Sequence, residues 1–523
     1  MNKVVPAFRG RMTDGGANRP FPKGIETGEF APWCADAYCE RTGTNPAMSF
    51  DSVRLVRENE LPEEGYRITV EEKGVEVSAS CERGAIWGLT TLYLLKDQEG
   101  QIPVCRIEDA PAHGHRGLML DCARHFFSAG EVKKIIEYCT LAKINVLHWH
   151  LSDDQGWRIE SRQFLLLHET SGSYYTQNEI RQIVEYARRR GMEIIPEIDL
   201  PGHTSGILAA YPEYGCRQEK VQLAECGGIY RTILCAGKED AFTFLDMLLK
   251  EVCGLFPSGR FHIGGDEAPK NEWEECPDCR KRMENERHLT ADDLQGYFSN
   301  RVAGILKKYG KTPVCWDDTL ISDLRPEGMA VQYWNIQRAK QLKDFSVKGK
   351  FIYSDMFELY LDYPHSMIPL KKIYGSCPKI GKKDFRSSDS FMGMEACLWS
   401  EHIETEEELE KHIFPRIYAL AENTWSDSKD YSSFLLRLPV LMKKCAEGGA
   451  ACTPLESCNP KGRVRQSETM AYFLKMNSAM TPEIRAKTVE SAKPSREFAR
   501  RFATQFFRLS DMPLLLKVMK QPK

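Results

Sequence analysis

The 523-residue sequence predicts an α/β protein: a (β/α)8 TIM barrel, preceded by a small α+β domain and followed by a helical C-terminal extension. Three observations predict it. Two alternating segments around a turn come first, a long run of apolar strands and helices follows, and a basic helical region ends the chain. Eight β–α repeats within roughly 315 residues fit a closed barrel better than an open sheet. We therefore expect domains at 1–110, 111–435 and 436–523.

The first domain is predicted from apolar and polar residues that alternate. Residues 67–79 alternate on both sides of Lys73-Gly74, which predicts two strands joined by a tight turn. Residues 83–95 then repeat apolar side chains at helical spacing. The stretch 108–114 is typical of a linker, and we place the end of the domain there.

In the barrel region, short apolar runs predict eight strands. They are 117–121, 145–150, 193–198, 260–264, 312–316, 330–334, 351–354 and 392–398. The helices predicted between and after them include 129–142, 177–190, 242–255, 291–309 and 406–425. In a barrel of this kind, the loops after the carboxyl ends of the strands build the active site.

The composition excludes several classes of protein. Apolar residues make up 42% and charged residues 28%, as in ordinary globular chains, and the net charge of −3 gives no global reason for a nucleic-acid or anionic membrane partner. No apolar run approaches the ~20 residues of a membrane-spanning helix, and residues 1–12 lack the apolar core of a secretory signal. We therefore expect a soluble, cytoplasmic protein that binds neither nucleic acid nor membrane.

The C-terminal extension differs from the remainder in charge. Residues 461–523 hold 14 Lys and Arg against 5 Asp and Glu, a net charge of +9. Such a tail could contact RNA, a membrane surface or a partner subunit. A solvated helical face docked on the acidic body is the favoured interpretation, and the tail is also a candidate interface for a homo-oligomer.

Many of the eighteen cysteines lie inside apolar runs, for example Cys139, Cys315 and Cys397. Because no export signal is evident, buried and reduced thiols that act as small hydrophobic side chains are the favoured interpretation. This interpretation predicts no disulfide framework.

One cysteine motif leaves an alternative open. Cys276-Pro-Asp-Cys279 has the spacing of metal and redox sites, and Cys216, Cys226 and Cys235 precede it as conceivable partners. No second C-x-x-C motif and no later H-x-x-x-H motif accompany it. A structural zinc ion is therefore the less favoured interpretation.

Polar and aromatic side chains gather at the predicted carboxyl ends of the strands. In chain order these are Asp121, Arg124, His148, His150, Asp153, Asp154, Glu197, Asp199, His203, His262, Asp266, Glu267, Trp316, Asp317, Asp318, Trp334, Tyr360, Asp362, Trp399 and Glu401. Flat Trp and Tyr rings cover the apolar faces of a sugar, while Asp, Glu and Arg bind its hydroxyls. No phosphate-binding Gly-rich loop is evident. The residue types therefore favour a carbohydrate ligand.

The segment His262-Ile-Gly-Gly-Asp266-Glu267 is the most specific of these. Retaining glycosidases with a nucleophile of their own need two carboxylates ~5 Å apart on opposite sides of the scissile bond. Sequence neighbours are poorly placed for that. Glu267 could instead protonate the leaving oxygen while Asp266 orients a nucleophile of the substrate, such as a 2-acetamido carbonyl. A tight turn with a helix cap is the alternative for this segment alone.

Six segments carry a resemblance to a known family: HRGLMLDCARHFF, NVLHWHLSDDQGWRIE, EIIPEIDLPGH, FHIGGDEAP, YLDYP and MEACLWSE. In this order, across roughly residues 113–425, they resemble the family 20 glycoside hydrolases, the β-N-acetylhexosaminidases. The preceding α+β unit resembles the companion domain of that family. The resemblance implies exo-acting, substrate-assisted retaining hydrolysis of terminal β-linked GlcNAc or GalNAc through an oxazolinium intermediate, with no metal or cofactor.

The resemblance also implies catalytic roles. Glu267 would be the general acid and then the general base, and Asp266 would hold the acetamido N–H and stabilise its developing positive charge. Tyr360 would bind the acetamido oxygen. Asp153 and His203 would form a relay that supports Glu267, and we expect Glu267 to be buried so that its carboxyl is protonated near neutrality.

The remaining implied roles concern the sugar pocket. Trp316, Trp334 and Trp399 would form its walls, and Arg124, Asp362 and Glu401 would hold the outer hydroxyls. Some members of the family carry a further pocket tryptophan after the YLD motif, but residues 363–378 contain none. This departure puts in doubt how the far side of the sugar is bound.

Three alternatives stay open. A lacto-N-biosidase that releases a disaccharide would share the acetamido chemistry. His148-x-His150, with His203 and His262 at later strand ends, is also the pattern that opens the metal site of amidohydrolase-like barrels. A sugar-binding barrel without catalysis is disfavoured by the intact Asp266-Glu267 pair.

Overall fold

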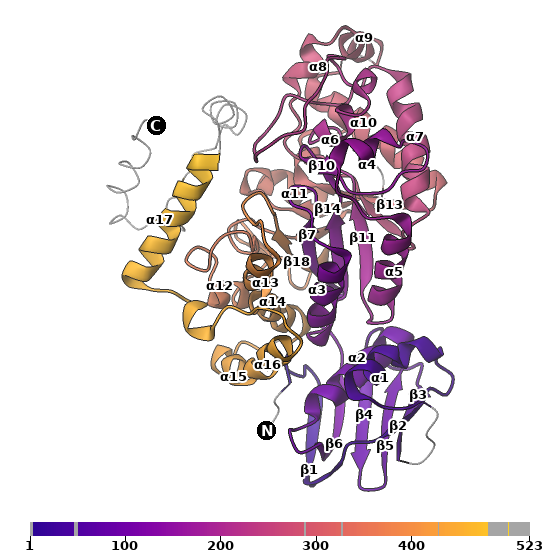
Figure 1. Cartoon of the computed structure of the whole chain (residues 1–523), viewed down its shortest axis with the longest axis vertical. Helices are drawn as coiled ribbons and strands as arrows, with labels where there is room; N and C mark the ends of the chain where they lie inside the picture. The colour runs from indigo at the N-terminus through magenta and orange to yellow at the C-terminus, as the bar shows by residue number, and fades with distance from the viewer. Residues whose placement is uncertain are drawn as a thin grey trace.

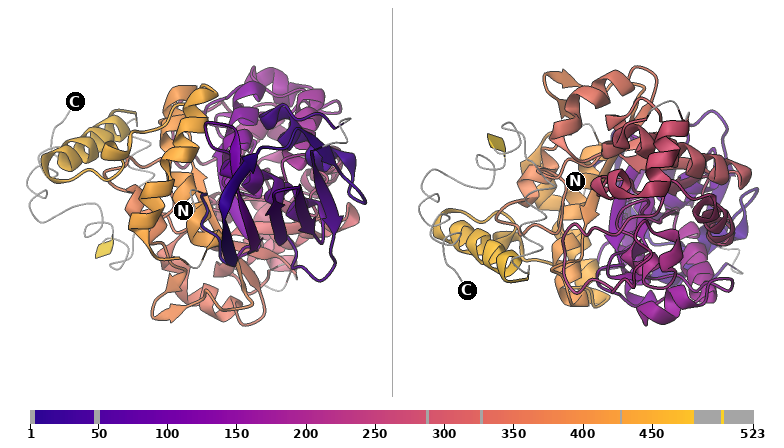
Figure 2. Two further views of the ribbon diagram at one scale, coloured as in Figure 1. Left: turned by 90° about the horizontal axis from the view of Figure 1, so that it is seen from below. Right: turned by 90° about the horizontal axis from the view of Figure 1, so that it is seen from above.

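The computed structural model describes residues 4–46, 51–286, 289–325, 328–426, 428–479 and 500–501. A small sheet domain lies at one end of a barrel, and a group of C-terminal helices lies along one side of it (Figures 1 and 2). The predicted fold class, a TIM barrel with a small α+β domain before it and helices after it, is confirmed. The predicted domain boundaries stay predictions.

The N-terminal domain is a six-stranded sheet with the strand order β1-β6-β4-β5-β3-β2. Its strands are β1 (Arg11–Pro20), β2 (Gly24–Glu26), β3 (Ser52–Arg57), β4 (Tyr66–Glu71), β5 (Gly74–Ala79) and β6 (Gln101–Asp109). Its helices are η1 (Pro32–Ala35), α1 (Asp36–Thr42) and α2 (Glu82–Leu95). The predicted hairpin is the antiparallel β4–β5 pair, and the predicted helix is α2, which packs on both strands and buries Trp87.

The barrel closes with eight parallel strands, and all eight predicted strands are confirmed. They are β7 (His115–Asp121), β8 (Val146–His150), β11 (Glu193–Glu197), β12 (Arg260–His262), β13 (Thr312–Trp316), β14 (Ala330–Tyr333), β15 (Lys350–Tyr353) and β18 (Phe391–Leu398). Two short hairpins, β9 (Ser152–Asp153) with β10 (Gly156–Trp157) and β16 (Lys379–Ile380) with β17 (Lys383–Asp384), extend from loops. Because apolar runs that are buried on both faces are typical of parallel strands, the sequence pattern located the barrel well.

Helices surround the strands and occupy the loops. They are α3 (Ala129–Leu141), α4 (Leu166–Ser171), α5 (Gln177–Arg188), α6 (Ser205–Leu208), η2 (Pro212–Tyr214), α7 (Glu239–Cys253), α8 (Asn271–Glu275), α9 (Pro277–Asn285), α10 (Ala291–Lys308), η3 (Asp317–Ile321), η4 (Ile336–Arg338), α11 (Ala339–Phe345), α12 (Leu370–Tyr374), α13 (Glu406–Ile413) and α14 (Arg416–Trp425). The single helix predicted over 406–425 is wrong, because α13 ends at Ile413 and α14 begins at Arg416. Phe414, which precedes Pro415, is extended with φ −100° and ψ 132°. A proline disfavours helical backbone at the residue before it and has no N–H of its own to donate.

The C-terminal helices are α15 (Tyr431–Arg437), α16 (Pro439–Glu447), η5 (Leu455–Ser457) and α17 (Gly462–Ala479). Helix α17 stands beside the barrel (Figure 1), where Thr469 Oγ1 donates to Ser366 Oγ over 2.9 Å. Much of the predicted basic tail, 480–499 and 502–523, lies outside the described residues. Among the helices that are described, none is long and apolar enough to cross a membrane.

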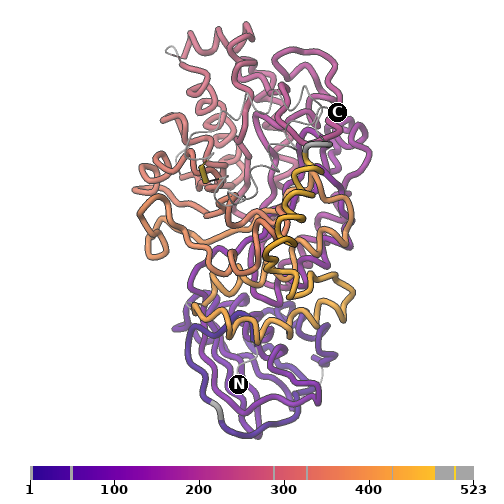
Figure 3. Tube along the Cα trace, turned by 90° about the vertical axis from the view of Figure 1, so that its left-hand side faces the viewer, coloured from indigo at the N-terminus to yellow at the C-terminus, as the bar shows by residue number. Residues whose placement is uncertain are grey.

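A buried polar cluster joins the N-terminal domain to the barrel. The hydroxyl of Tyr66 and Nε1 of Trp425 both donate to Asp109 Oδ2, over 2.8 and 2.9 Å. Lys143 Nζ donates to Tyr66 Oη over 2.8 Å and lies 4.3 Å from the centroid of the Trp425 ring. Burial lowers the pKa of Lys143 to about 8, although Asp109 opposes the shift. The cluster holds the small domain at the end of the barrel opposite α8 and α9, as the indigo part of Figure 3 and the labels of Figure 1 show.

Replacing Asp109 by Ala is expected to destabilise this interface strongly. The change leaves the Tyr66 hydroxyl and the Trp425 N–H without their buried acceptor and removes the carboxylate 3.8 Å from the Lys143 ammonium. Removing one partner of a buried ionic group costs about 3–5 kcal/mol. Urea unfolding followed by circular dichroism should show a lower midpoint. Glu108→Ala is the matched control, because Glu108 is 54% exposed in a surface pair with Arg67, worth about 1 kcal/mol or less. Equal midpoints for the two variants would contradict the expectation.

Candidate active site

The structure brings the predicted site residues to one end of the barrel, where each follows the carboxyl end of a strand. They are Arg124 after β7, Asp153 after β8, His203 after β11, Asp266 and Glu267 after β12, Trp316 at the end of β13, Trp334 after β14, Tyr360 and Asp362 after β15, and Trp399 and Glu401 after β18. This end carries α6, α8 and α9 and lies away from the N-terminal domain (Figure 1).

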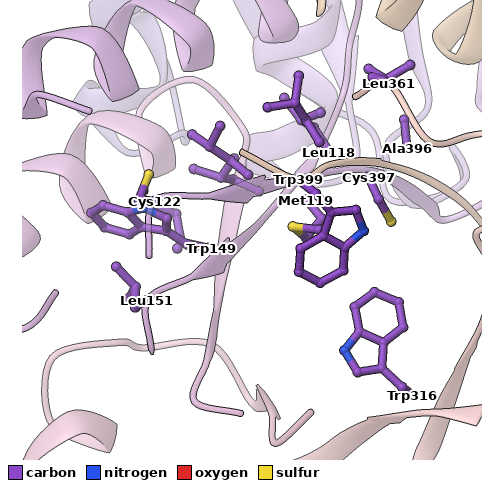
Figure 4. Packing of buried hydrophobic residues seen from close by; sticks show 14 of the residues in the cluster. Leu118, Met119, Cys122, Trp149, Leu151, Trp316, Leu361, Ala396, Cys397 and Trp399 are labelled. Carbon is purple, nitrogen blue, oxygen red and sulfur yellow. Dashed lines mark hydrogen bonds between the residues drawn. The ribbon is translucent and has the colours of Figure 1, made fainter. Parts of the chain in front are cut away.

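Four aromatic side chains form a continuous wall at this end. Ring centroids lie 5.7 Å apart for Trp316 and Trp399, 6.3 Å for Trp399 and Tyr360, and 6.4 Å for Tyr360 and Trp334. Figure 4 shows Trp316 and Trp399 side by side. The wall is fixed by hydrogen bonds beneath it, since Trp316 Nε1 donates to Glu197 Oε1 over 2.8 Å. Rigid rings in this arrangement can cover the apolar faces of a sugar.

The chain after β12 is turned sharply by two glycines. Gly264 has φ +63° and Gly265 has φ +102°, and a Cβ atom on Gly264 would overlap the Asp199 carboxylate. These positions therefore require glycine. Strand β12 consequently ends at His262, two residues before the predicted end of the strand.

The same turn separates the two adjacent carboxylates. Asp266 is 8% exposed, whereas the Glu267 side chain is 35% exposed, with the Glu267 backbone at φ +47°. The prediction that Glu267 is buried is wrong, because more than a third of its side chain is exposed. The exposed side chain of Glu267 therefore accompanies a left-handed backbone at this residue.

Asp266 forms a closely spaced acidic pair with Asp199, a residue to which the sequence analysis gave no role. Burial, with the nearby charges of Glu267 and Glu197, raises the pKa of Asp266 to about 7, although His203 opposes the shift. Burial and then Asp266 raise the pKa of Asp199 well above its usual range. Among the described residues, Asp266 Oδ1 has no hydrogen-bond partner. This oxygen is available to accept a hydrogen bond from a ligand.

A histidine connects Glu267 to buried charges. His203 Nε2 lies 3.6 Å from Glu267 Oε2, and His203 Nδ1 lies 3.1 Å from Asp153 Oδ1 and 3.3 Å from Asp154 Oδ2. Burial opposes protonation, but Asp153 raises the pKa of His203 well above its usual range. Arg124 Nη2 holds the other oxygen of Asp153 over 2.8 Å. The predicted relay from Asp153 through His203 to Glu267 is therefore assembled in space; its role in the reaction stays a prediction.

Arg124, Asp362 and Glu401 form a charged cluster at one edge of the aromatic wall. The Arg124 guanidinium carbon lies 4.8 Å from the Trp399 ring centroid. Burial and then the charge of Glu401 raise the pKa of Asp362 well above its usual range. Among the described residues, Asp362 Oδ1 has no hydrogen-bond partner. Cationic donors and open acceptors at one edge of an aromatic wall suit the hydroxyls of a sugar.

The histidines of the amidohydrolase alternative do not gather at this mouth. His150 Nδ1 lies 2.5 Å from Glu197 Oε2, and His262 Nδ1 lies 2.8 Å from Glu197 Oε1. His148 is held between Glu197 and Glu395 inside the barrel. Three of the four histidines therefore orient buried carboxylates beneath the aromatic wall. The sequence analysis placed Glu197 at a strand end but did not predict that it binds these histidines. The available signal was its position within the buried strand, where PEIDLPGH begins.

Comparison with known families and structures gives one consistent answer. The model described as "Glycosyl hydrolase family 20, catalytic domain" matches residues 113–428, and "Glycosyl hydrolase family 20, domain 2" matches residues 35–110. A Beta-hexosaminidase of Porphyromonas gingivalis is 34% identical over 418 residues, covering 72% of this chain and 53% of the relative. One of Akkermansia muciniphila is 32% identical over 408 residues, covering 72% of this chain and 82% of the relative.

Solved structures agree with these matches. The beta-N-acetylhexosaminidase of Bacteroides fragilis aligns with a TM-score of 0.79 and 28% identity, covering 88% of this chain and 99% of that one. A mutant Streptomyces plicatus beta-hexosaminidase in complex with product (GlcNAc) aligns with a TM-score of 0.75 and 28% identity, covering 86% of this chain and 96% of that one. The chain spans about half the length of the Porphyromonas gingivalis relative and most of the other proteins named.

Proposed function

This chain belongs to glycosyl hydrolase family 20, and we propose that it is an exo-acting, retaining β-N-acetylhexosaminidase that releases terminal β-linked GlcNAc or GalNAc from glycans. The observation that carries the proposal is the Asp266-Glu267 pair, in which a buried carboxylate has an open acceptor oxygen beside an exposed carboxylate. The names of the relatives and the GlcNAc complex of the Streptomyces plicatus neighbour support it. They do not favour release of a disaccharide.

In the first step, Asp266 accepts the N–H of the 2-acetamido group, which directs the acetamido oxygen at the anomeric carbon. A bond forms between these two atoms as the bond from the anomeric carbon to the glycosidic oxygen breaks. The departing oxygen takes the electron pair and receives the proton of Glu267. The resulting oxazolinium is cationic, and ionised Asp266 stabilises it while Tyr360 donates its hydroxyl hydrogen bond to the acetamido oxygen.

In the second step, Glu267 acts as a base. Water gives a proton to Glu267 and attacks the anomeric carbon, and the bond to the acetamido oxygen breaks. Two inversions at the same carbon retain the β configuration. Trp316, Trp334 and Trp399 would enclose the sugar, and Arg124, Asp362 and Glu401 would bind its outer hydroxyls.

A panel of 4-nitrophenyl β-glycosides tests the proposal. We expect release of nitrophenol from the GlcNAc and GalNAc glycosides and none above background from the glucoside, because only the 2-acetamido group supplies the nucleophile. The lacto-N-biose glycoside tests the disaccharide alternative. A thiazoline that mimics the bicyclic intermediate should inhibit at far lower concentration than GlcNAc. Equal cleavage of the glucoside, or an ester trapped on a protein carboxylate, would overturn the mechanism.

The pH profile should report the ionisation of Asp266. Because burial raises its pKa to about 7 and the mechanism needs its carboxylate, kcat/KM should rise with increasing pH on the acidic limb of the profile, and this rise should be centred near that value. The rates are to be measured with 4-nitrophenyl GlcNAc after controls for stability at each pH. In Asp266→Asn this rise should be absent. A rise centred below pH 5, or one retained in the variant, would contradict the assignment.

We further propose that the enzyme works in the cytoplasm and that the basic extension supports a homo-oligomer. None of the eighteen cysteines, all of which lie within the described residues, forms a disulfide, and a reducing compartment would preserve this state. The extension is opposite in net charge to the remainder of the chain. Light scattering after size exclusion, at low and high salt, measures whether the full chain self-associates.

A further inference from the structure

Four cysteines from two separate loops meet beside the active site. Cys216 and Cys235 flank the loop 217–234, which follows η2, while Cys276 and Cys279 belong to the turn between α8 and α9 and to α9 itself. The Sγ atoms lie 3.8 Å apart for Cys216 and Cys279, 3.8 Å for Cys235 and Cys276, and 3.6 Å for Cys235 and Cys279. All four Sγ atoms lie within 4.8 Å of one another.

These separations match a tetrahedral metal site. Zinc bound to four thiolates has Zn–S bonds of ~2.3 Å, so the sulfur atoms at the corners of the tetrahedron are ~3.8 Å apart. A disulfide would need ~2.05 Å, and all four residues are free cysteines. Cys235, Cys276 and Cys279 are buried. Four mutually adjacent sulfur atoms form a ligand set rather than the scattered thiols expected of small hydrophobic side chains.

The surrounding chain is built to bring the two pairs together. Cys235 N donates to Tyr214 O over 2.9 Å, which closes the base of the loop. Trp273 Nε1 on α8 donates to Leu234 O over 2.9 Å. A Cβ atom on Gly237 would overlap the backbone of Asp278, so only glycine allows this approach. Contacts made by residues other than the cysteines therefore hold the two cysteine pairs together.

We propose that Cys216, Cys235, Cys276 and Cys279 bind one structural zinc ion. For these four residues the geometry favours the interpretation that the sequence analysis had ranked second. Cys226, named earlier as a conceivable partner, is not one of the four clustered cysteines. Its Sγ lies 3.5 Å from Tyr230 Oη instead. Four protein ligands leave no open position, so the ion takes no part in the glycosidase reaction.

The ion would join the loops that carry the catalytic groups. The loop 217–234 follows β11 and His203, and α8–α9 follow β12 and the Asp266-Glu267 pair. The loop reaches the site, since Ala224 N donates to Asp154 O over 2.9 Å and a Cβ atom on Gly227 would lie 2.9 Å from Glu401 Cγ. Zinc would thus fix the position of a loop that packs against the sugar-binding edge.

Metal analysis of the purified full-length protein tests the proposal. Elemental analysis by mass spectrometry should find one zinc ion per chain in the wild type and in Cys226→Ser, the matched control from the same loop. The double variant Cys276→Ser/Cys279→Ser should contain almost none. Because the double variant can fail to fold, cobalt exchange into the wild type gives a second readout. Tetrahedral Co²⁺ bound to four thiolates should show intense visible bands and a thiolate-to-metal charge-transfer band.

Several results would overturn the proposal. They are a wild type without zinc after growth with zinc supplied, octahedral rather than tetrahedral cobalt spectra, and zinc retained in the double variant. A thiol titration of denatured, unreduced protein that finds fewer than eighteen thiols would point to disulfides instead. None of these measurements depends on hexosaminidase activity, so their outcome is independent of the proposed function.

Discussion

Glu267→Gln is expected to abolish turnover of natural glycosides while leaving sugar binding largely intact. Glutamine keeps the size of the side chain but can neither protonate the glycosidic oxygen nor accept a proton from water. General acid–base catalysis contributes about 10²–10⁴-fold, and the loss should reach the upper part of that range for poor leaving groups. Rates on a β-linked GlcNAc disaccharide, compared with 4-nitrophenyl and 2,4-dinitrophenyl GlcNAc, measure it.

The leaving group and an added nucleophile identify the step that is affected. A dinitrophenolate leaves without protonation, so the variant should lose least in the first step on that substrate. Azide needs no general base, and it should restore turnover by forming the glycosyl azide. Glu274→Gln is the matched control, since Glu274 is exposed on α8 after the same strand. Near-normal turnover of the disaccharide by Glu267→Gln would refute the assigned role.

The barrel could be predicted from the sequence because each of its strands has a recognisable pattern of neighbouring residues. Each buried parallel strand is a short apolar run, and the rim side chains follow directly, so the carboxyl ends of the strands and their residues could be located together. One wrong prediction had a local signal against it in the sequence. Pro415 stands inside the helix predicted over 406–425, and its effect on the preceding residue divides that helix.

Other features depend on contacts between distant residues and have no local pattern. Asp199 shares its environment with Asp266, 67 residues later, only because β11 and β12 are neighbours in the barrel. Glu267 is exposed at the end of a turn in which Gly264, Gly265 and Glu267 have positive φ angles, and residue types alone do not dictate such a backbone at a glutamate. The four cysteines likewise converge through loop packing, since Cys216 and Cys279 are 63 positions apart.

The C-terminal extension also contacts the site through residues that are distant in sequence. Tyr472 on α17 packs edge-on against Tyr363, with ring centroids 5.6 Å apart, next to Asp362. Lys475 Nζ donates to His402 O over 2.7 Å, next to Glu401. The sequence has no tryptophan in residues 363–378, and here a helix about a hundred residues later packs behind the edge that would bind the outer hydroxyls. A spacing rule within the YLD motif cannot reveal such a contribution.

Asp266→Asn is expected to lower kcat on 4-nitrophenyl GlcNAc by roughly 100-fold, about 3 kcal/mol of transition-state stabilisation, as for loss of one oxyanion-hole donor. Asparagine can still accept the acetamido N–H, so KM should change little, but it carries no negative charge for the oxazolinium. Its NH2 group could even turn toward the acetamido N–H and misalign the nucleophile. The effect should therefore fall on kcat rather than on binding.

The control separates this electrostatic effect from a general loss of structure. Asp292→Asn changes a half-buried carboxylate at the start of α10, which is paired with Lys270, and should leave kcat unchanged. If Asp266→Asn kept kcat within about twofold, stabilisation of a cationic intermediate by Asp266 would be excluded. If kcat/KM fell only through KM, Asp266 would bind the acetamido group equally in the ground and transition states. Only a loss in kcat distinguishes a carboxylate that stabilises the oxazolinium from one that merely recognises the N-acetyl group.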